Sequence, residues 1–158
     1  MALGELYSFD TSAFINGQRD QFPPDVVPRL WPKIAGLIEF GQVQSVDVVL
    51  HELKQKDDET ATWCKAQHGL FVPLDLDIQQ ATRTVLKTCP KLIGVGSGRS
   101  GADPFVVALA LARGGSVVTD ETATGHPQRP KIPDACAAVG VRCMNLLAFI
   151  REQGWSFG

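Results

Sequence analysis

The chain of 158 residues lacks several features that mark specialised classes of protein. Its four cysteines form no Cys-x-x-Cys pair and have no histidine at zinc-finger spacing, which argues against zinc fingers and redox motifs and favours reduced thiols. The net charge of -2 excludes a histone-like basic coat, although a local basic patch stays possible. No apolar run approaches the ~20 residues of a membrane span, and no signal peptide pattern is present. We therefore expect a soluble, cytoplasmic protein without a membrane contact.

What the chain does contain is typical of one globular domain, expected over residues 1–158. Hydrophobic residues make up 44% and charged residues 20%, which is close to the globular average. No repeat of 20–50 residues and no low-complexity segment is visible. A chain of this size buries enough surface to fold without a disulfide or a structural metal.

Strand and helix patterns alternate along the chain. Short apolar runs predict strands at residues 6–9, 43–46, 70–72, 116–119 and 141–144. Helical periodicity and caps predict helices at residues 26–40, 47–53, 57–67, 75–88 and 103–113, a short one from 134, and one from 145 to 153. A loop is expected after Asp10, and Asp75 is expected to cap a helix. This alternation predicts an α/β fold: a three-layer α/β/α sandwich with about five parallel strands.

Acidic side chains follow the predicted strands. Asp10 comes directly after the first strand, and Glu52 lies in the first turns of the helix after the second. Asp103 begins the helix that leads to the fourth strand, which Asp120 and Glu121 follow. Because parallel strands end at one edge of a sheet, we expect these acids to meet there. Clustered carboxylates repel one another, and a hard cation such as Mg²⁺ relieves that repulsion. The pattern therefore predicts metal-dependent hydrolysis of a phosphodiester.

Each acid also has a structural interpretation that the sequence leaves open. Asp10 fits an Asx turn, and Asp103 fits the N-cap of its helix. Glu52 fits an ion pair with Lys56, four positions farther on. The two acids after the fourth strand fit an ordinary polar loop.

Four segments together resemble the PIN-domain family of metal-dependent ribonucleases, which includes the VapC-like toxins of toxin–antitoxin pairs. They are Tyr-Ser-Phe-Asp-Thr-Ser at 7–12, Val-Leu-His-Glu-Leu at 49–53, Ala-Asp-Pro-Phe-Val-Val-Ala-Leu-Ala at 102–110 and Val-Val-Thr-Asp-Glu at 117–121. Their order and spacing match over nearly the whole chain, and the first and third are the most specific. The C-terminal segments at 131–136 and 141–146 look like those of an uncharacterised PIN-like branch.

This resemblance implies a Mg²⁺ or Mn²⁺ pocket made by Asp10, Glu52 and Asp103, with the Ser12 hydroxyl near the metal. A fourth acid usually follows the fourth strand, and both Asp120 and Glu121 are candidates for it. The resemblance further implies an endoribonuclease that leaves 5′-phosphate and 3′-hydroxyl ends. A cognate antitoxin and pairing into a homodimer belong to the same expectation.

Two loops and one alternative function complete the expectations. The glycine-rich stretch 94–101 matches neither a Walker nor a Rossmann motif, and its Arg99 is a candidate for contacting a substrate phosphate. The loop from 121 to 133 carries His126, Arg129 and Lys131, and it is either an RNA contact or a solvated surface. The alternative to a ribonuclease is a catalytically weak PIN-like module that binds RNA or protein.

Overall fold

The computed structural model describes residues 5–56, 58–93 and 101–157 of the chain. Its centre is one five-stranded sheet in which every pair of neighbouring strands is parallel. The spatial order of the strands is β3-β2-β1-β4-β5. Their bounds are β1 Tyr7–Phe9, β2 Val43–Val46, β3 Phe71–Val72, β4 Ser116–Val118 and β5 Arg142–Met144. All five strands lie where the sequence predicts them.

Helices connect the strands and cover the sheet. They are α1 Thr11–Asn16, α2 Leu30–Glu39, α3 Asp47–Lys56, α4 Asp58–Lys65, α5 Leu76–Thr88, α6 Asp103–Arg113, α7 Ile132–Val139 and α8 Leu146–Gln153. A π-helical turn, Gly17–Gln21, follows α1, and a 3₁₀ turn, Pro90–Ile93, follows α5. As predicted, Asp75 caps α5, because its carboxylate accepts from Ile78 N at 2.9 Å.

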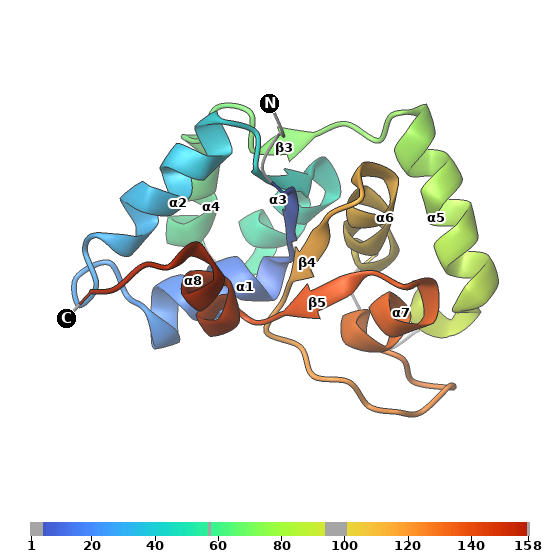
Figure 1. The fold of residues 1–158 in the computed structure, drawn as a ribbon. Coiled ribbons are helices and arrows are strands. Elements are labelled where there is room, and N and C mark those ends of the chain that lie inside the picture. The colour runs from blue at the N-terminus through green and yellow to red at the C-terminus, as the bar shows by residue number, and fades with distance from the viewer. Residues whose placement is uncertain (1–4, 57, 94–100, 158) are drawn as a thin grey trace.

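The helices form two outer layers around the sheet (Figure 1). On one face α6 packs against β1, β2 and β4, with α5 and α7 beside it. On the other face lie α2 and α8, and Phe149 of α8 packs edge-on against the rings of Tyr7 and Phe9. The predicted three-layer α/β/α sandwich is therefore present.

Alternation along β1 explains how this short strand serves both layers. Tyr7 and Phe9 face α8, whereas the buried Ser8 faces α6 and donates from Oγ to Val106 O at 2.8 Å. The small side chain of Ser8 lets the backbone of α6 approach the sheet closely. This close approach brings the start of α6 to the carboxyl edge, next to the residue that follows β1.

Two predicted helix boundaries are wrong for local reasons. The helix predicted at 26–40 begins only at Leu30, and Val26 is 69% exposed. Prolines at 24 and 28 have no backbone N–H to extend the helix backwards. The helix predicted from Asp134 begins at Ile132, because the Asp134 carboxylate accepts from Lys131 N at 2.8 Å and closes a capping box.

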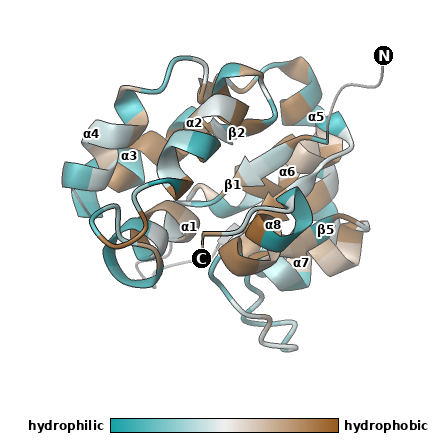
Figure 2. Ribbon diagram, turned by 60° about the vertical axis from the view of Figure 1, so that its left-hand side comes forward, coloured by the Kyte–Doolittle hydropathy of each residue, from teal (hydrophilic) through white to brown (hydrophobic). Residues whose placement is uncertain are grey.

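A further difference is α1, which replaces the loop expected after Asp10. The helix is short and its polar face is exposed to the pocket described below, so its apolar residues are too few to show a clear period. Coloured by hydropathy, α4 and the loop after β4 are largely hydrophilic, and hydrophilic residues also lie on α2, α5 and α8 (Figure 2).

Among the residues that the structure describes, no helix combines the length and the apolar character needed to cross a membrane.

Candidate functional site

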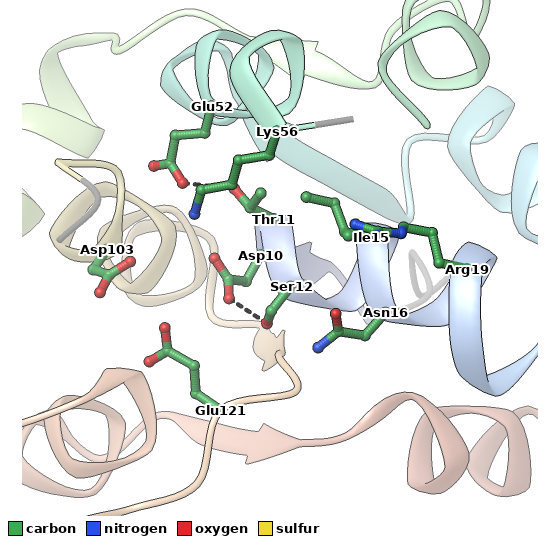
Figure 3. A pocket seen from close by; sticks show the side chains of 10 residues that line it. All are labelled: Asp10, Thr11, Ser12, Ile15, Asn16, Arg19, Glu52, Lys56, Asp103 and Glu121. Carbon is green, nitrogen blue, oxygen red and sulfur yellow. Dashed lines mark hydrogen bonds between the residues drawn. The ribbon is translucent and has the colours of Figure 1, made fainter. Parts of the chain in front are cut away.

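A pocket of about 410 Å³ opens at the carboxyl edge of the sheet. Side chains from α1, α3, α6 and the end of β4 converge on it (Figure 3). The residues that line it are Asp10, Thr11, Ser12, Ile15, Asn16, Arg19, Glu52, Lys56, Asp103 and Glu121. Four carboxylates that are far apart in sequence are thus brought together, as the strand order predicts.

Asp10 lies at the floor of this pocket and is 2% exposed. Its backbone N–H donates to Val118 O of the neighbouring strand at 2.9 Å, which continues the sheet pairing beyond β1. Its carboxylate accepts no backbone N–H at the start of α1, so the Asx-turn interpretation is wrong. Instead Oδ2 accepts from Ser12 Oγ at 2.7 Å and from Thr119 Oγ1 at 2.9 Å. Two hydroxyls therefore fix the orientation of Asp10.

The Ser12 hydroxyl belongs to a wider network. Its Oγ also accepts from Asp120 N at 2.9 Å and lies 3.2 Å from Thr119 Oγ1. The network joins the first turn of α1 to the segment that follows β4. Ser12 therefore holds two walls of the pocket together as well as orienting Asp10.

Glu52 reaches the pocket from α3 and is hydrogen-bonded at both carboxylate oxygens. Oε2 accepts from Thr11 Oγ1 at 3.0 Å, and Oε1 accepts from Ala102 N at 3.2 Å. Burial raises the pKa of Glu52, and the charge of Asp10 raises it further, while Thr11, Lys56 and Ala102 act in the opposite direction. Glu52 is therefore a half-buried, positioned carboxylate, and Lys56 is only one of several groups acting on it.

Asp103 is the first residue of α6 and is 5% exposed. The N-cap of α6 is Ala102, so the prediction that Asp103 itself is the cap is wrong. Pro104 then occupies the second position of the helix, where its missing N–H does no harm. Asp103 is thus not the N-cap residue of α6, and it lines the pocket.

The two acids after β4 point to different places. Glu121 lines the pocket, and its Oε1 accepts from Ile132 N at 3.0 Å. Asp120 instead accepts from Asn16 Nδ2 at 2.6 Å and from Gln21 Nε2 at 2.8 Å. Asp120 therefore anchors the end of α1 and the π-helical turn, whereas Glu121 faces the other three acids (Figure 3).

Two cationic side chains also line the pocket. Lys56 extends between Glu52 and Asp10, and Arg19 lies farther along, beyond Ile15 (Figure 3). Sequence reasoning considered Lys56 only as a partner of Glu52, and it missed Arg19 and Asn16. The spacing of Ser12 and Asn16 places both on one face of α1, so recognising α1 would have found Asn16, whereas Arg19 lies in the π-helical turn that follows. Arg99, the other predicted cation, lies outside the described residues.

The oxygen donors of the pocket are those that Mg²⁺ and Mn²⁺ prefer. In the described parts of the chain, however, no three His, Cys, Asp or Glu side chains stand close enough together to hold one metal ion. The pocket therefore has carboxylates of the kind that bind these ions, but in the described residues they do not stand close enough together to surround one ion.

The molecule was compared with known structures and sequences. Its fold is similar to that of FitAcB from Neisseria gonorrhoeae, with a TM-score of 0.55, 16% sequence identity, and coverage of 89% of this chain and 97% of that chain. Together with the all-parallel five-stranded sheet, this similarity confirms the predicted PIN-like three-layer fold. No curated protein matches the sequence.

A family model covers nearly the whole chain, from residue 7 to residue 157. The matched segment includes all five strands and each acid of the pocket. The chain therefore belongs to the family described as a domain of unknown function, DUF4411.

Proposed function

We propose that this protein is a metal-dependent endoribonuclease that hydrolyses RNA phosphodiester bonds. The observation that carries the proposal is the convergence of Asp10, Glu52, Asp103 and Glu121 on one pocket of a PIN-like fold. Within this cluster, burial and the neighbouring Asp10 carboxylate raise the pKa of Glu52, so the ionised form of Glu52 is unfavourable for stability alone. Such a cluster is favoured where a cation is to be bound.

The four carboxylates are the residues that would hold Mg²⁺ or Mn²⁺. When bound, such an ion neutralises charge on a phosphate and lowers the pKa of a coordinated water. Asp120 was the other candidate for the fourth acid, but it accepts from the amides of Asn16 and Gln21 and is not among the residues that line the pocket. The proposal therefore assigns the fourth position to Glu121.

The remaining polar residues of the pocket orient these groups and contact the substrate. Ser12 and Thr119 both donate to Oδ2 of Asp10, and these two hydrogen bonds fix the orientation of the carboxylate in the pocket. Lys56 and Arg19 supply positive charge on the same wall and would bind the non-bridging oxygens of the RNA backbone. Anionic RNA would otherwise be repelled by the four acids.

The biological setting is part of the proposal. The sequence resemblance to VapC-like toxins supports a toxin of a toxin–antitoxin pair, working in the cytoplasm. A cognate antitoxin protein would cover the acidic pocket, and pairing into a homodimer is expected from the same resemblance.

A second candidate function is a PIN-like module that binds RNA or protein and cuts weakly or not at all. One observation favours it: the acids of the described residues do not form a ready metal site. The two candidates differ in whether a divalent ion stabilises the fold, because a ligand that binds only the native state raises the melting temperature.

The first test is cleavage of a mixed pool of structured RNAs with Mg²⁺ or Mn²⁺, beside an EDTA control. The variant Asp10→Asn removes one pocket carboxylate, and Asp77→Asn is its matched control on an exposed position of α5. We expect metal-dependent cleavage that Asp10→Asn abolishes and Asp77→Asn keeps. Full cleavage by Asp10→Asn would disprove the assignment. If wild type shows neither cleavage nor a thermal shift with Mn²⁺, the binding module is the better description.

A further inference from the structure

A second cavity, of about 450 Å³, lies between the end of α5, the start of α7 and the loop that follows β4. We call it the loop pocket and define it by Pro90, Lys91, His126, Pro127, Gln128 and Pro130, which are among its lining residues. None of them belongs to the acidic pocket. Its volume lies within the range of sites that hold small molecules.

The loop that forms this cavity has a defined shape. The Asp134 carboxylate accepts from the backbone N–H groups of Thr124, Gly125 and Lys131, at 2.8 to 3.0 Å. These hydrogen bonds keep the pKa of Asp134 below its usual value even though partial burial acts to raise it. These hydrogen bonds hold the loop in one shape, which distinguishes it from an ordinary solvated loop.

The side chains that line the loop pocket carry groups that can hydrogen-bond or pair with a ligand, and the hydrogen bonds of Asp134 hold the loop that bears most of them. Gln128 N donates to His126 Nδ1 at 3.1 Å, which places the hydrogen of the neutral imidazole on Nε2. His126 therefore offers an oriented donor together with an aromatic face. Lys91 contributes a cation from the opposite wall, and the Gln128 amide carries both a donor and an acceptor.

The loop pocket and the acidic pocket are connected through the first turn of α7. Glu121, which lines the acidic pocket, accepts from Ile132 N at the start of this helix. Two residues farther on, Asp134 holds the loop of the second cavity. One rigid helical turn therefore sets the position of both cavities relative to each other.

From this geometry we infer that the loop pocket binds one nucleotide of a single-stranded RNA that also passes through the acidic pocket. His126 stacks on the base, Gln128 hydrogen-bonds its edge, and Lys91 binds a phosphate. Arg129 and Lys131, both exposed on the same loop, extend the positive charge along the strand. The inference rests on the proposed function, because it names the substrate and the direction of its path.

The test measures binding of a fluorescent single-stranded RNA of mixed sequence, in EDTA so that no cleavage occurs. Lys91→Ala and His126→Ala probe the loop pocket. Lys65→Ala and His68→Ala are matched controls, since both residues are exposed and lie outside the two cavities. We expect roughly five- to tenfold weaker binding in each loop-pocket variant, and unchanged binding in the controls. Lys91→Ala should also reduce the slope of log K against log salt by about 0.7, because one phosphate contact is lost.

The possible outcomes separate this inference from the proposed function. Unchanged binding in Lys91→Ala and His126→Ala overturns the inference and would leave the cavity for a protein partner, while cleavage still decides the ribonuclease. An equal loss in all four variants overturns it as well, since it shows only general electrostatic attraction. A wild type that binds no RNA overturns it directly. A selective loss in the two variants, with no cleavage by wild type, supports the inference and contradicts the ribonuclease.

Discussion

Acidic side chains gather at both edges of the sheet, but the two edges treat them differently. At the carboxyl edge, four acids line the acidic pocket with two cations on its wall. At the amino edge, Glu5 and Glu152 lie around Arg142, which pairs with both of them. Tyr7, at the start of β1, donates its hydroxyl to Glu152. We call these four residues the amino-edge network.

The pKa of a glutamate shifts in opposite directions at the two edges: it is lowered for Glu152 and raised for Glu52. In the amino-edge network, the hydrogen bond from Tyr7 and the proximity of Arg142 lower the pKa of Glu152. The same contact with Glu152 raises the pKa of Arg142. In the acidic pocket, burial and the charge of Asp10 raise the pKa of Glu52. The charged form of an acid is therefore stabilised at one edge and destabilised at the other.

We expect this difference to separate a structural use of carboxylates from a functional one. The amino-edge network joins the starts of β1 and β5 to the end of α8. In it, the positive charge of Arg142 lies against the negative charges of Glu5 and Glu152. The acidic pocket gathers four carboxylates around a cavity that a ligand can enter. The predictions below test whether stability and activity divide between the two edges in this way.

The largest effect is expected for Asp103→Asn. Loss of one pocket carboxylate should lower kcat/KM for metal-dependent RNA cleavage by at least about a hundredfold, or roughly 2.7 kcal/mol of transition-state stabilisation. The fold should remain intact, because Asn has almost the same shape. Steady-state cleavage assays measure the first quantity and thermal unfolding the second. Cleavage within twofold of wild type would remove Asp103 from the site.

The next effect distinguishes the two acids after β4. Glu121→Gln should slow cleavage by about tenfold, or roughly 1.4 kcal/mol, because its carboxylate faces the other three. Asp120→Asn is the matched control and should change cleavage by less than about twofold, since Asp120 is directed toward Asn16 and Gln21. The same assay compares both variants. A larger loss in Asp120→Asn than in Glu121→Gln would reverse the assignment of the fourth acid.

In the amino-edge network, Tyr7→Phe should affect stability alone. Removing the hydroxyl deletes its hydrogen bond to Glu152 and should lower the free energy of unfolding by about 1 kcal/mol. Urea denaturation measures the change, and cleavage at saturating substrate should stay as in wild type. If activity fell in parallel with stability, the two edges would not be functionally separate.

The smallest effect is a gain of stability in Glu52→Gln. The folded state raises the pKa of Glu52, so the carboxyl favours folding below its unfolded pKa of about 4.3 and loses that contribution as the pH rises through the folded value. At pH 8 in EDTA, wild type therefore has an unfavourable ionised carboxylate that Gln lacks. We expect a slightly higher Tm for the variant at that pH, and a difference that shrinks toward pH 4. A Tm below that of wild type at pH 8 would contradict this account.

Much of this architecture could be predicted from the sequence. The strands are short segments rich in apolar or β-branched residues that lie between helical patterns, so all five positions were predictable from local patterns. Because parallel strands end at one edge, the convergence of Asp10, Glu52 and Asp103 followed from element order alone. The three-layer α/β/α fold was predictable from the alternation of strands and helices, and its PIN-like character was implied by the resemblance of the four segments.

Other features depended on contacts between distant segments. Asp120 is held by Asn16 and Gln21, whose amides lie about a hundred positions away in sequence, while its neighbour Glu121 lines the pocket. Adjacent residues after a strand point in different directions, and no local pattern says which direction faces a pocket. Helix α1 was not predicted from the sequence. A helix of six residues is not stable by itself, and α1 is stabilised by the packing of Phe14 into the core.

The sequence by itself thus determined the order of the elements and the edge at which the acids collect, because periodicity and caps act over a few neighbouring residues. Only the tertiary structure decided which carboxylate oxygens are held, by Ser12 and Thr119 at Asp10 and by Thr11 and Ala102 at Glu52. It also decided that Asp134 organises the loop after β4. Hydrogen bonds depend on distances of a few tenths of an ångström, and those distances are set by packing across the whole molecule.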